Sequence, residues 1–150
     1  MLGELLGEAG YQVQVIEPFR GLALPQDLGE KDILVVMGGP MGVADVGKAA
    51  TPWLAPVVDL LRSRLAKDWP NVGVCLGMQL IAHAAGAKVS PMADTEGRRL
   101  REVGWGRLDF VGTDPITRGL PASIEVLHWH GDGCELPMGA DLLASTSVCP

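Results

Sequence analysis

The sequence of 150 residues lacks the features that mark several classes of protein. Its three cysteines are irregularly spaced and form no C-x-x-C pair, so we expect no disulfide framework and a reducing, cytoplasmic setting. The longest aliphatic run, residues 33–37, is far shorter than the roughly 20 apolar residues of a membrane-spanning helix, so no membrane partner is expected. Basic residues (12) are fewer than acidic ones (18) and form no cluster, so no nucleic-acid partner is expected.

The hydrophobic pattern in the first half of the chain alternates between helical and strand periods. Helices are expected at residues 1–9, 52–65 and 76–85, and short strands around 12–16, 33–37, 71–74 and 87–90. Thr51 is expected to cap the second helix, and Pro56 to shift its start or bend it. This alternation predicts parallel βαβ units in an α/β fold.

The second half of the chain has a different pattern. Residues 98–110 and 123–129 are predicted strands with no helix between them. We expect a strand-rich extension that packs on the same core, so the prediction is one domain over residues 1–150.

The segment Gly73-Val74-Cys75-Leu76-Gly77 lies where a predicted strand meets a predicted helix. A nucleophile between two glycines at this junction is the pattern of the nucleophile elbow. The sharp turn strains the backbone of the central residue, and small neighbours allow close approach. Cys75 is therefore predicted to stand at a helix N-terminus, where the dipole favours a thiolate and the Leu76 amide can bind an oxyanion.

Two further features favour a functional Cys75 over a buried, inert cysteine. Gly38-Gly39-Pro40 forms a turn after the neighbouring strand, and the carboxyl ends of parallel strands open on one crevice. Gln79 follows Cys75 by one helical turn, so its amide is expected to face a polar ligand.

These residues resemble the class I glutamine amidotransferase family. The resemblance rests on the segments around Cys75 and Gly39, on Glu102-Val103-Gly104-Trp105, and on His130-Gly131-Asp132, in this order along the chain. It implies a flavodoxin-like, doubly wound and mostly parallel sheet with helices on both faces. It also implies hydrolysis of the L-glutamine side-chain amide through a cysteine thioester. Ammonia would then pass to an acceptor, which a synthetase partner could bind, and no cofactor is needed.

The resemblance assigns a role to each matching residue. Cys75 would be the nucleophile, and the amides of Gly39 and Leu76 would bind the oxyanion. Gln79 would hold the substrate. The backbone of Trp129, His130 and Gly131 would grip the α-amino and α-carboxylate groups. Glu102 is expected to be structural.

The chain departs from the family pattern in two places. The family's first strand and its Q-F-H-P-E-like segment, which supplies the base, have no match here, so the chain is expected to be an incomplete domain that does not turn over. His83 lies about 12 Å along the predicted helix from Cys75 and cannot reach it. His130 is the one conceivable substitute for the base.

A metal site is not predicted, and two other interpretations stay open at this point. The segment His128-Trp129-His130-Gly131-Asp132 has a metal-ligand pattern, but no histidine follows it, so no metal site is predicted. The chain could instead be a cysteine hydrolase of γ-glutamyl bonds from the same superfamily. It could also be a glutamine-binding relative that lacks the base.

Overall fold

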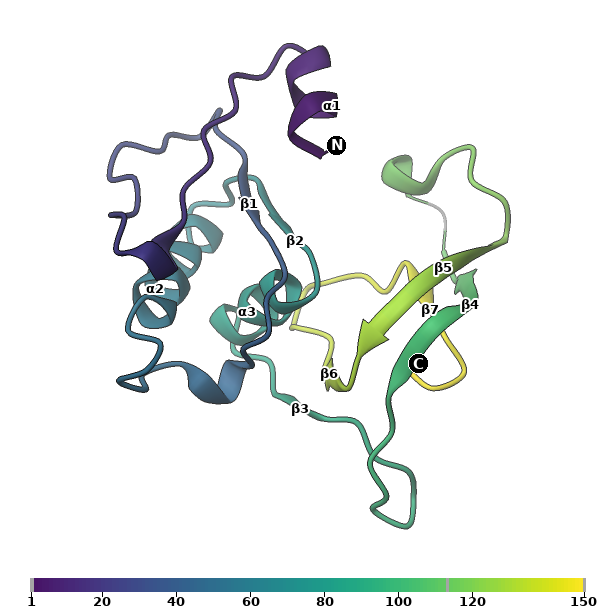
Figure 1. Ribbon diagram of the computed structural model, residues 1–150. Helices are drawn as coiled ribbons and strands as arrows, with labels where there is room; N and C mark the ends of the chain where they lie inside the picture. Colours follow the sequence, from purple (N-terminus) through teal and green to yellow (C-terminus); the bar gives the residue numbers. More distant parts are fainter. Residues whose placement is uncertain (1, 113, 150) are drawn as a thin grey trace.

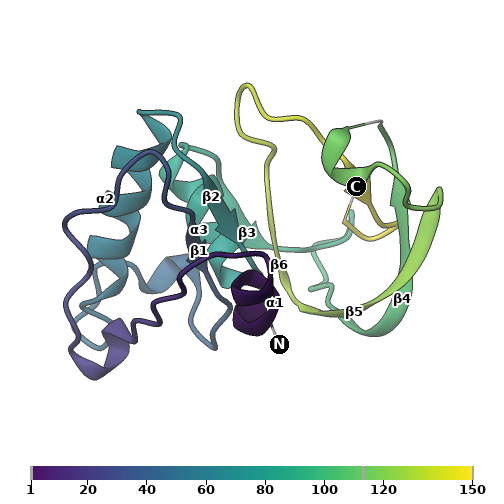
Figure 2. The same cartoon turned by 90° about the horizontal axis from the view of Figure 1, so that it is seen from above.

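The computed structural model describes residues 2–112 and 114–149, which form two lobes (Figures 1 and 2). The first lobe holds α2, α3, β1 and β2, and the second holds β4, β5 and β7, with the strands β3 and β6 between them. The helices and strands are α1 (Leu2–Glu8), β1 (Leu34–Val36), α2 (Leu54–Leu65), β2 (Asn71–Gly73), α3 (Leu76–Ala84), β3 (Val89–Pro91), β4 (Glu102–Phe110), β5 (Ser123–His130), β6 (Asp132–Cys134) and β7 (Ala144–Ser145). Among the described helices, none has the length and apolar content needed to cross a membrane.

The sheets are small and of both kinds. Strand β1 pairs with β2 in parallel, with Leu34 opposite Asn71 and Val36 opposite Gly73. The pairs β3–β6, β4–β5 and β4–β7 are antiparallel. The fold class is α/β as predicted, and in the described residues its parallel pairing is confined to β1 and β2.

The core lies between α2 and α3 and beneath the parallel strands. Six of its side chains are at most 6% exposed, namely Leu54, Val57, Val58, Leu61, Leu76 and Leu80. The α2 members repeat every three or four residues, which places them on one face of the helix. The predicted stripe on this helix therefore forms the core.

The prediction that Thr51 caps the N-terminus of α2 was wrong. The Thr51 hydroxyl donates to the Asp45 carbonyl oxygen at 2.6 Å instead of capping the helix, which begins at Leu54. Pro56 lies in the first turn of α2, where a backbone amide has no partner within the helix, so the proline is tolerated.

The strand predicted around residues 12–16 was also wrong. Residues 11–17 form neither a helix nor a strand, and Val15 is 79% exposed. Alternating valines favour extended backbone, but a strand also needs a neighbouring strand, and none of the described segments pairs with this one.

Arg64 is a charged residue inside the core lobe, only 1% exposed. Its guanidinium donates to the carbonyl oxygens of Asp32 (2.5 Å) and Pro70 (2.9 Å) and to Asn71 Oδ1 (3.0 Å). These acceptors lie just before β1 and at the start of β2. Arg64 therefore ties α2 to the beginning of both parallel strands.

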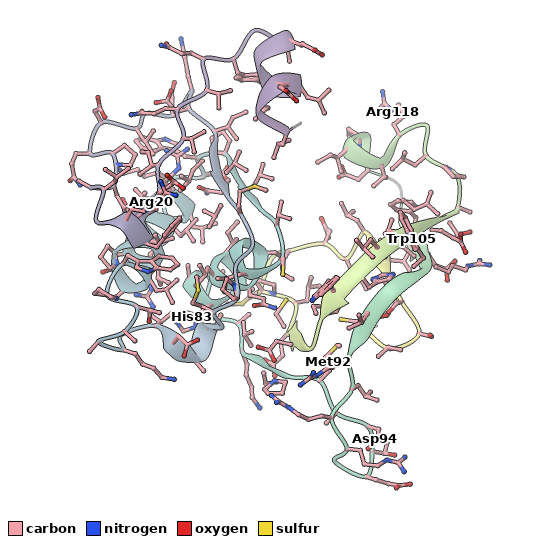
Figure 3. All side chains as sticks on the ribbon, in the orientation of Figure 1. Arg20, His83, Met92, Asp94, Trp105 and Arg118 are labelled. Carbon is pink, nitrogen blue, oxygen red and sulfur yellow. The ribbon has the colours of Figure 1, made fainter. Side chains whose placement is uncertain are left out.

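The hairpin of β4 and β5 has one exposed apolar face. Val103 lies opposite Trp129, and Trp105 opposite Leu127, and these four side chains are 57–76% exposed. Figure 3 shows Trp105 projecting from this sheet. None of residues 93–112 and 114–149 is buried, so the second lobe has no core of its own.

Candidate active site

Cys75 occupies the tight junction between β2 and α3. Its backbone has φ 54° and ψ −114°, a conformation that non-glycine residues rarely adopt. A Cβ on Gly73 would lie 2.5 Å from the Met78 nitrogen, and one on Gly77 would overlap the Val36 carbonyl oxygen. The two flanking glycines therefore allow the strand, the turn and the helix to approach one another closely, as the elbow pattern predicts.

The glycine turn after β1 lies against the same junction. A Cβ on Gly38 would be 3.2 Å from the Cys75 Cβ, and one on Gly39 would be 3.0 Å from the Met41 Cε. This proximity follows from the parallel pairing of β1 and β2, which brings their carboxyl ends to one edge. Leu76 is the first residue of α3, so its amide has no acceptor within the helix.

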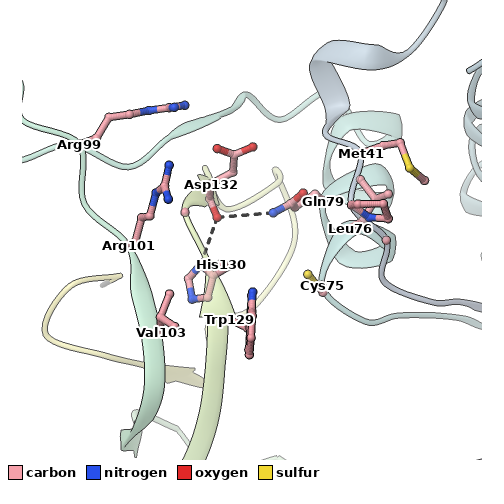
Figure 4. Close-up of a pocket in the computed structure, with 13 residues that line it drawn as sticks. Met41, Cys75, Leu76, Gln79, Arg99, Arg101, Val103, Trp129, His130 and Asp132 are labelled. Carbon is pink, nitrogen blue, oxygen red and sulfur yellow. Dashed lines mark hydrogen bonds between the residues drawn. The ribbon is translucent and has the colours of Figure 1, made fainter. Parts of the chain in front are cut away.

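A pocket of about 360 Å³ opens beside Cys75 and lies between the two lobes (Figure 4). All seven residues given a role from the sequence line it: Gly39, Cys75, Leu76, Gln79, Trp129, His130 and Gly131. The first four come from the core lobe and the last three from the end of β5 and the turn after it. The structure brings the seven together, and their chemical roles remain predictions.

Gln79 is more buried than a freely available amide would be. It is 5% exposed, and its Nε2 donates a long hydrogen bond of 3.5 Å to the Asp132 carbonyl oxygen. This bond crosses from α3 to β6 (Figure 4). A bond of this length is weak, so a ligand with a better acceptor can replace it.

His130 is held by its own neighbours and not by Cys75. Its Nδ1–H donates to the Asp132 carbonyl oxygen at 3.2 Å, and its Nε2 lies 3.1 Å from Glu102 Oε2. Among the described residues, no hydrogen bond joins an imidazole to Cys75. His83 lies on the side of α3 away from β4 and β5 (Figure 3).

Two arginines in the pocket were missed from the sequence. Arg99 and Arg101 lie across the pocket from α3, and neither guanidinium pairs with another described residue (Figure 4). The stem of Arg101 passes over Gly131, where an added Cβ would be 3.1 Å from its Cγ. The expectation that basic residues form no cluster overlooked the three arginines within residues 98–101, which were the available signal in a chain of net charge −6.

The other two cysteines are less accessible than Cys75, which is exposed. Burial raises the pKa of the Cys134 thiol. The pKa of Cys149 is also raised, by burial and then by the negative charges of Glu102 and Cys134. Both thiols are therefore poor nucleophiles near neutral pH.

Comparison with known proteins decides the family. The model for "Glutamine amidotransferase class-I" matches residues 1–148. The chain belongs to this family. Among curated class I glutamine amidotransferases and related proteins, it is 32% identical over 142 residues to a GMP synthase [glutamine-hydrolyzing] of Ectopseudomonas mendocina, covering 84% of this chain and 24% of the relative. It is 28% identical over 148 residues to the glutamine amidotransferase-like protein YfeJ of Salmonella typhimurium, covering 95% of this chain and 59% of YfeJ.

Solved structures of glutamine amidotransferases share the fold. One from Thermotoga maritima matches with a TM-score of 0.86 at 27% identity, covering 99% of this chain and 62% of the other. One from Methylobacillus flagellatus matches with a TM-score of 0.81 at 27% identity, covering 99% and 56%. The fold is thus the flavodoxin-like fold of class I glutamine amidotransferases. The chain spans under two thirds of the length of these relatives.

Proposed function

We propose that this glutamine amidotransferase chain binds L-glutamine in the pocket and attacks its side-chain amide with Cys75. The observation that carries the proposal is the strained Cys75 at the start of α3, with Gln79 and the end of β5 around one pocket. A backbone strained at such a point is typical of a functional position.

The proposed chemistry divides the amide hydrolysis into two steps, and because no imidazole is hydrogen-bonded to Cys75 among the described residues, we expect this chain to carry them out slowly at best. The Cys75 sulfur attacks the amide carbon, and the amides of Gly39 and Leu76 stabilise the oxyanion that forms. The carbon–nitrogen bond then breaks, and ammonia leaves with the thiol proton. Water hydrolyses the remaining thioester to glutamate and restores the thiol.

The substrate's α-carboxylate needs positive charge, which the core lobe does not bring to the pocket. We assign this contact to Arg99 and Arg101, whose guanidinium groups line the pocket without partners among the described residues. The α-amino group is assigned to the backbone around Trp129, His130 and Gly131. Gln79 would exchange its long bond to Asp132 for one to the substrate.

The proposal extends to the cellular compartment of the chain and to the acceptor of the ammonia. The three cysteines are free, and a nucleophilic thiol must stay reduced, so we place the chain in the cytoplasm. The ammonia would be used by a synthetase domain or by a separate acceptor protein. Assays with γ-glutamyl peptides would separate an amidotransferase from a γ-glutamyl hydrolase, because only the hydrolase cleaves them.

The proposal is tested with a glutamine analogue that carries a diazoketone in place of the side-chain amide. Mass spectrometry should find one label per chain, on Cys75, and Cys75→Ala should abolish it. Cys134→Ala is the matched control and should be labelled as fast as the unaltered chain, since burial raises the pKa of the Cys134 thiol. Equal labelling of Cys134 or Cys149, or labelling of the Cys75→Ala variant, would refute the assignment of the nucleophile.

A glutamine-binding role without turnover is the second candidate. It is favoured by the contacts of His130, both of whose ring nitrogens face Glu102 and Asp132. Calorimetry that detects glutamine binding, together with an assay that finds no glutamate after prolonged incubation, would support this role. Release of glutamate and ammonia in equal amounts would exclude it.

A further inference from the structure

Three potential metal ligands meet on the inner face of the β4–β5 hairpin. Glu102 lies directly opposite His130 in the antiparallel register, and His128 lies two residues earlier on the same face of β5. One ligand atom from each of these residues lies within 4.8 Å of those of the other two. The set combines two imidazoles with a carboxylate.

Backbone carbonyl groups fix the hydrogen position on both imidazoles. His128 Nε2 is 3.3 Å from the Gly106 oxygen, and His130 Nδ1 is 3.2 Å from the Asp132 oxygen. A carbonyl oxygen can only accept, so each of these nitrogens carries a hydrogen. The other nitrogen of each neutral ring then presents a lone pair, which is how carbonyl partners orient histidine ligands at metal sites.

One oxygen of the Glu102 carboxylate is buried and accepts no hydrogen bond from the described residues. The Glu102 side chain is only 10% exposed, and this oxygen, Oε2, lies 3.1 Å from His130 Nε2. A buried carboxylate oxygen without a partner is costly, and a cation would satisfy it. Two ligands of a tetrahedral zinc ion lie roughly 3.3 Å apart, close to this separation.

We propose that Glu102, His128 and His130 bind one zinc ion, with its fourth position taken by water. Two imidazoles and one carboxylate are a ligand set suited to Zn²⁺. The set differs from the H-x-H-x-D pattern of the sequence, because the Asp132 carboxylate points elsewhere, within 3.6 Å of the position of a Cβ on Gly42. The zinc ion has a positioning role. It holds His130, which lines the pocket, and thereby fixes the pocket wall that faces Cys75.

The test measures zinc binding to the full chain with all three cysteines changed to serine, which removes thiol ligands. Equilibrium dialysis against Zn²⁺ at pH 7.5, with elemental analysis, should give one ion per chain. Glu102→Gln and His128→Gln should each weaken binding at least tenfold. His83→Gln is the matched control, since His83 lies outside the cluster, and it should bind like the parent.

Two further measurements distinguish the loss of zinc ligands from misfolding, and neither depends on glutamine hydrolysis. Circular dichroism must show parent-like spectra for the variants, and one equivalent of Zn²⁺ should raise the melting temperature of the parent and of His83→Gln only. Co²⁺ should give the strong visible absorption of a four-coordinate site. Substoichiometric zinc, or equal affinity in Glu102→Gln, His128→Gln and His83→Gln, would overturn the proposal.

Discussion

At the residue scale, Gly77 sets how closely α3 approaches β1. A Cβ on this glycine would overlap the Val36 carbonyl oxygen, which belongs to the strand backbone and cannot rotate away. The start of α3 also carries Cys75 and Leu76, so the position of the candidate nucleophile depends on this contact. Any larger residue at position 77 must push the helix away from the strand.

We therefore expect Gly77→Ala to lower the free energy of unfolding by about 3 kcal/mol, as overpacked cores do. Urea unfolding followed by far-UV circular dichroism measures this change. Gly7→Ala is the matched control, because a Cβ there has nothing within 4 Å and lies in the exposed helix α1. It should leave stability unchanged or raise it by up to about 1 kcal/mol. Equal losses in the two variants would contradict the close packing described at Gly77.

At the element scale, α2 is joined to the parallel strands by one buried guanidinium. Arg64 donates to three carbonyl oxygens, those of Gly29, Asp32 and Pro70, and to the Asn71 side chain. Removal of the guanidinium takes away all of these part-buried hydrogen bonds at once. The neighbouring Arg62 is exposed, and its partner among the described residues is Asp59 on the same helix.

The change of Arg64 to Met keeps an apolar stem and removes the donors. We expect it to lower the free energy of unfolding by about 3 kcal/mol, the range for breaking a buried charged network. Arg62→Met should cost less than about 1 kcal/mol, since exposed ion pairs contribute little. Chemical denaturation of both variants measures the difference, and similar midpoints would show that Arg64 is not a structural tie.

The elements differ in how far the sequence could predict them. The predicted stripe consisted of Leu54, Val57, Val58, Leu61 and Leu65, of which all but the partly buried Leu65 belong to the core. It predicted both α2 and its buried face, because the helical period is a local property. Arg64 escaped prediction, since a charged residue is normally expected at the surface and its acceptors come from distant segments. The strand around Val15 was predicted wrongly because strand formation depends on a neighbour that local pattern does not reveal.

At the scale of the whole molecule, the pocket lies between a lobe that has a hydrophobic core and a lobe that has none among its described residues. The core residues lie in α2 and α3, whereas the second lobe is held by the β4–β5 ladder with one apolar face exposed. Local unfolding costs least where little apolar surface is buried.

Amide hydrogen exchange measured by mass spectrometry should therefore separate the lobes. Amides of Leu54–Leu65 and Leu76–Ala84 should exchange at least tenfold more slowly than those of Glu102–Phe110 and Ser123–His130. The same experiment on chemically unfolded chain supplies the reference rates. Equal protection in the two lobes would mean that the hairpin shares the stability of the core.

The candidate site was predictable in its glycine turns and its cysteine, and less so in its charged residues. Motif spacing placed Gly39, Cys75 and Gln79 together, because parallel strands share one edge. Arg99 and Arg101 were missed since their position depends on how the chain returns from β3 to β4. The partnership of Glu102 with His128 depends on the antiparallel register, which no single segment encodes.

The positive φ of Cys75 also bears on how selection acts on this chain. A non-glycine residue in such a conformation costs about 1–3 kcal/mol, whereas glycine adopts it freely. Replacement of Cys75 by glycine would thus remove the sulfur and make the fold more stable at the same time. A lineage in which the sulfur has no function would gain stability by replacing Cys75 with glycine. Retention of cysteine at this position therefore indicates selection for the thiol, and its loss indicates selection for the fold alone.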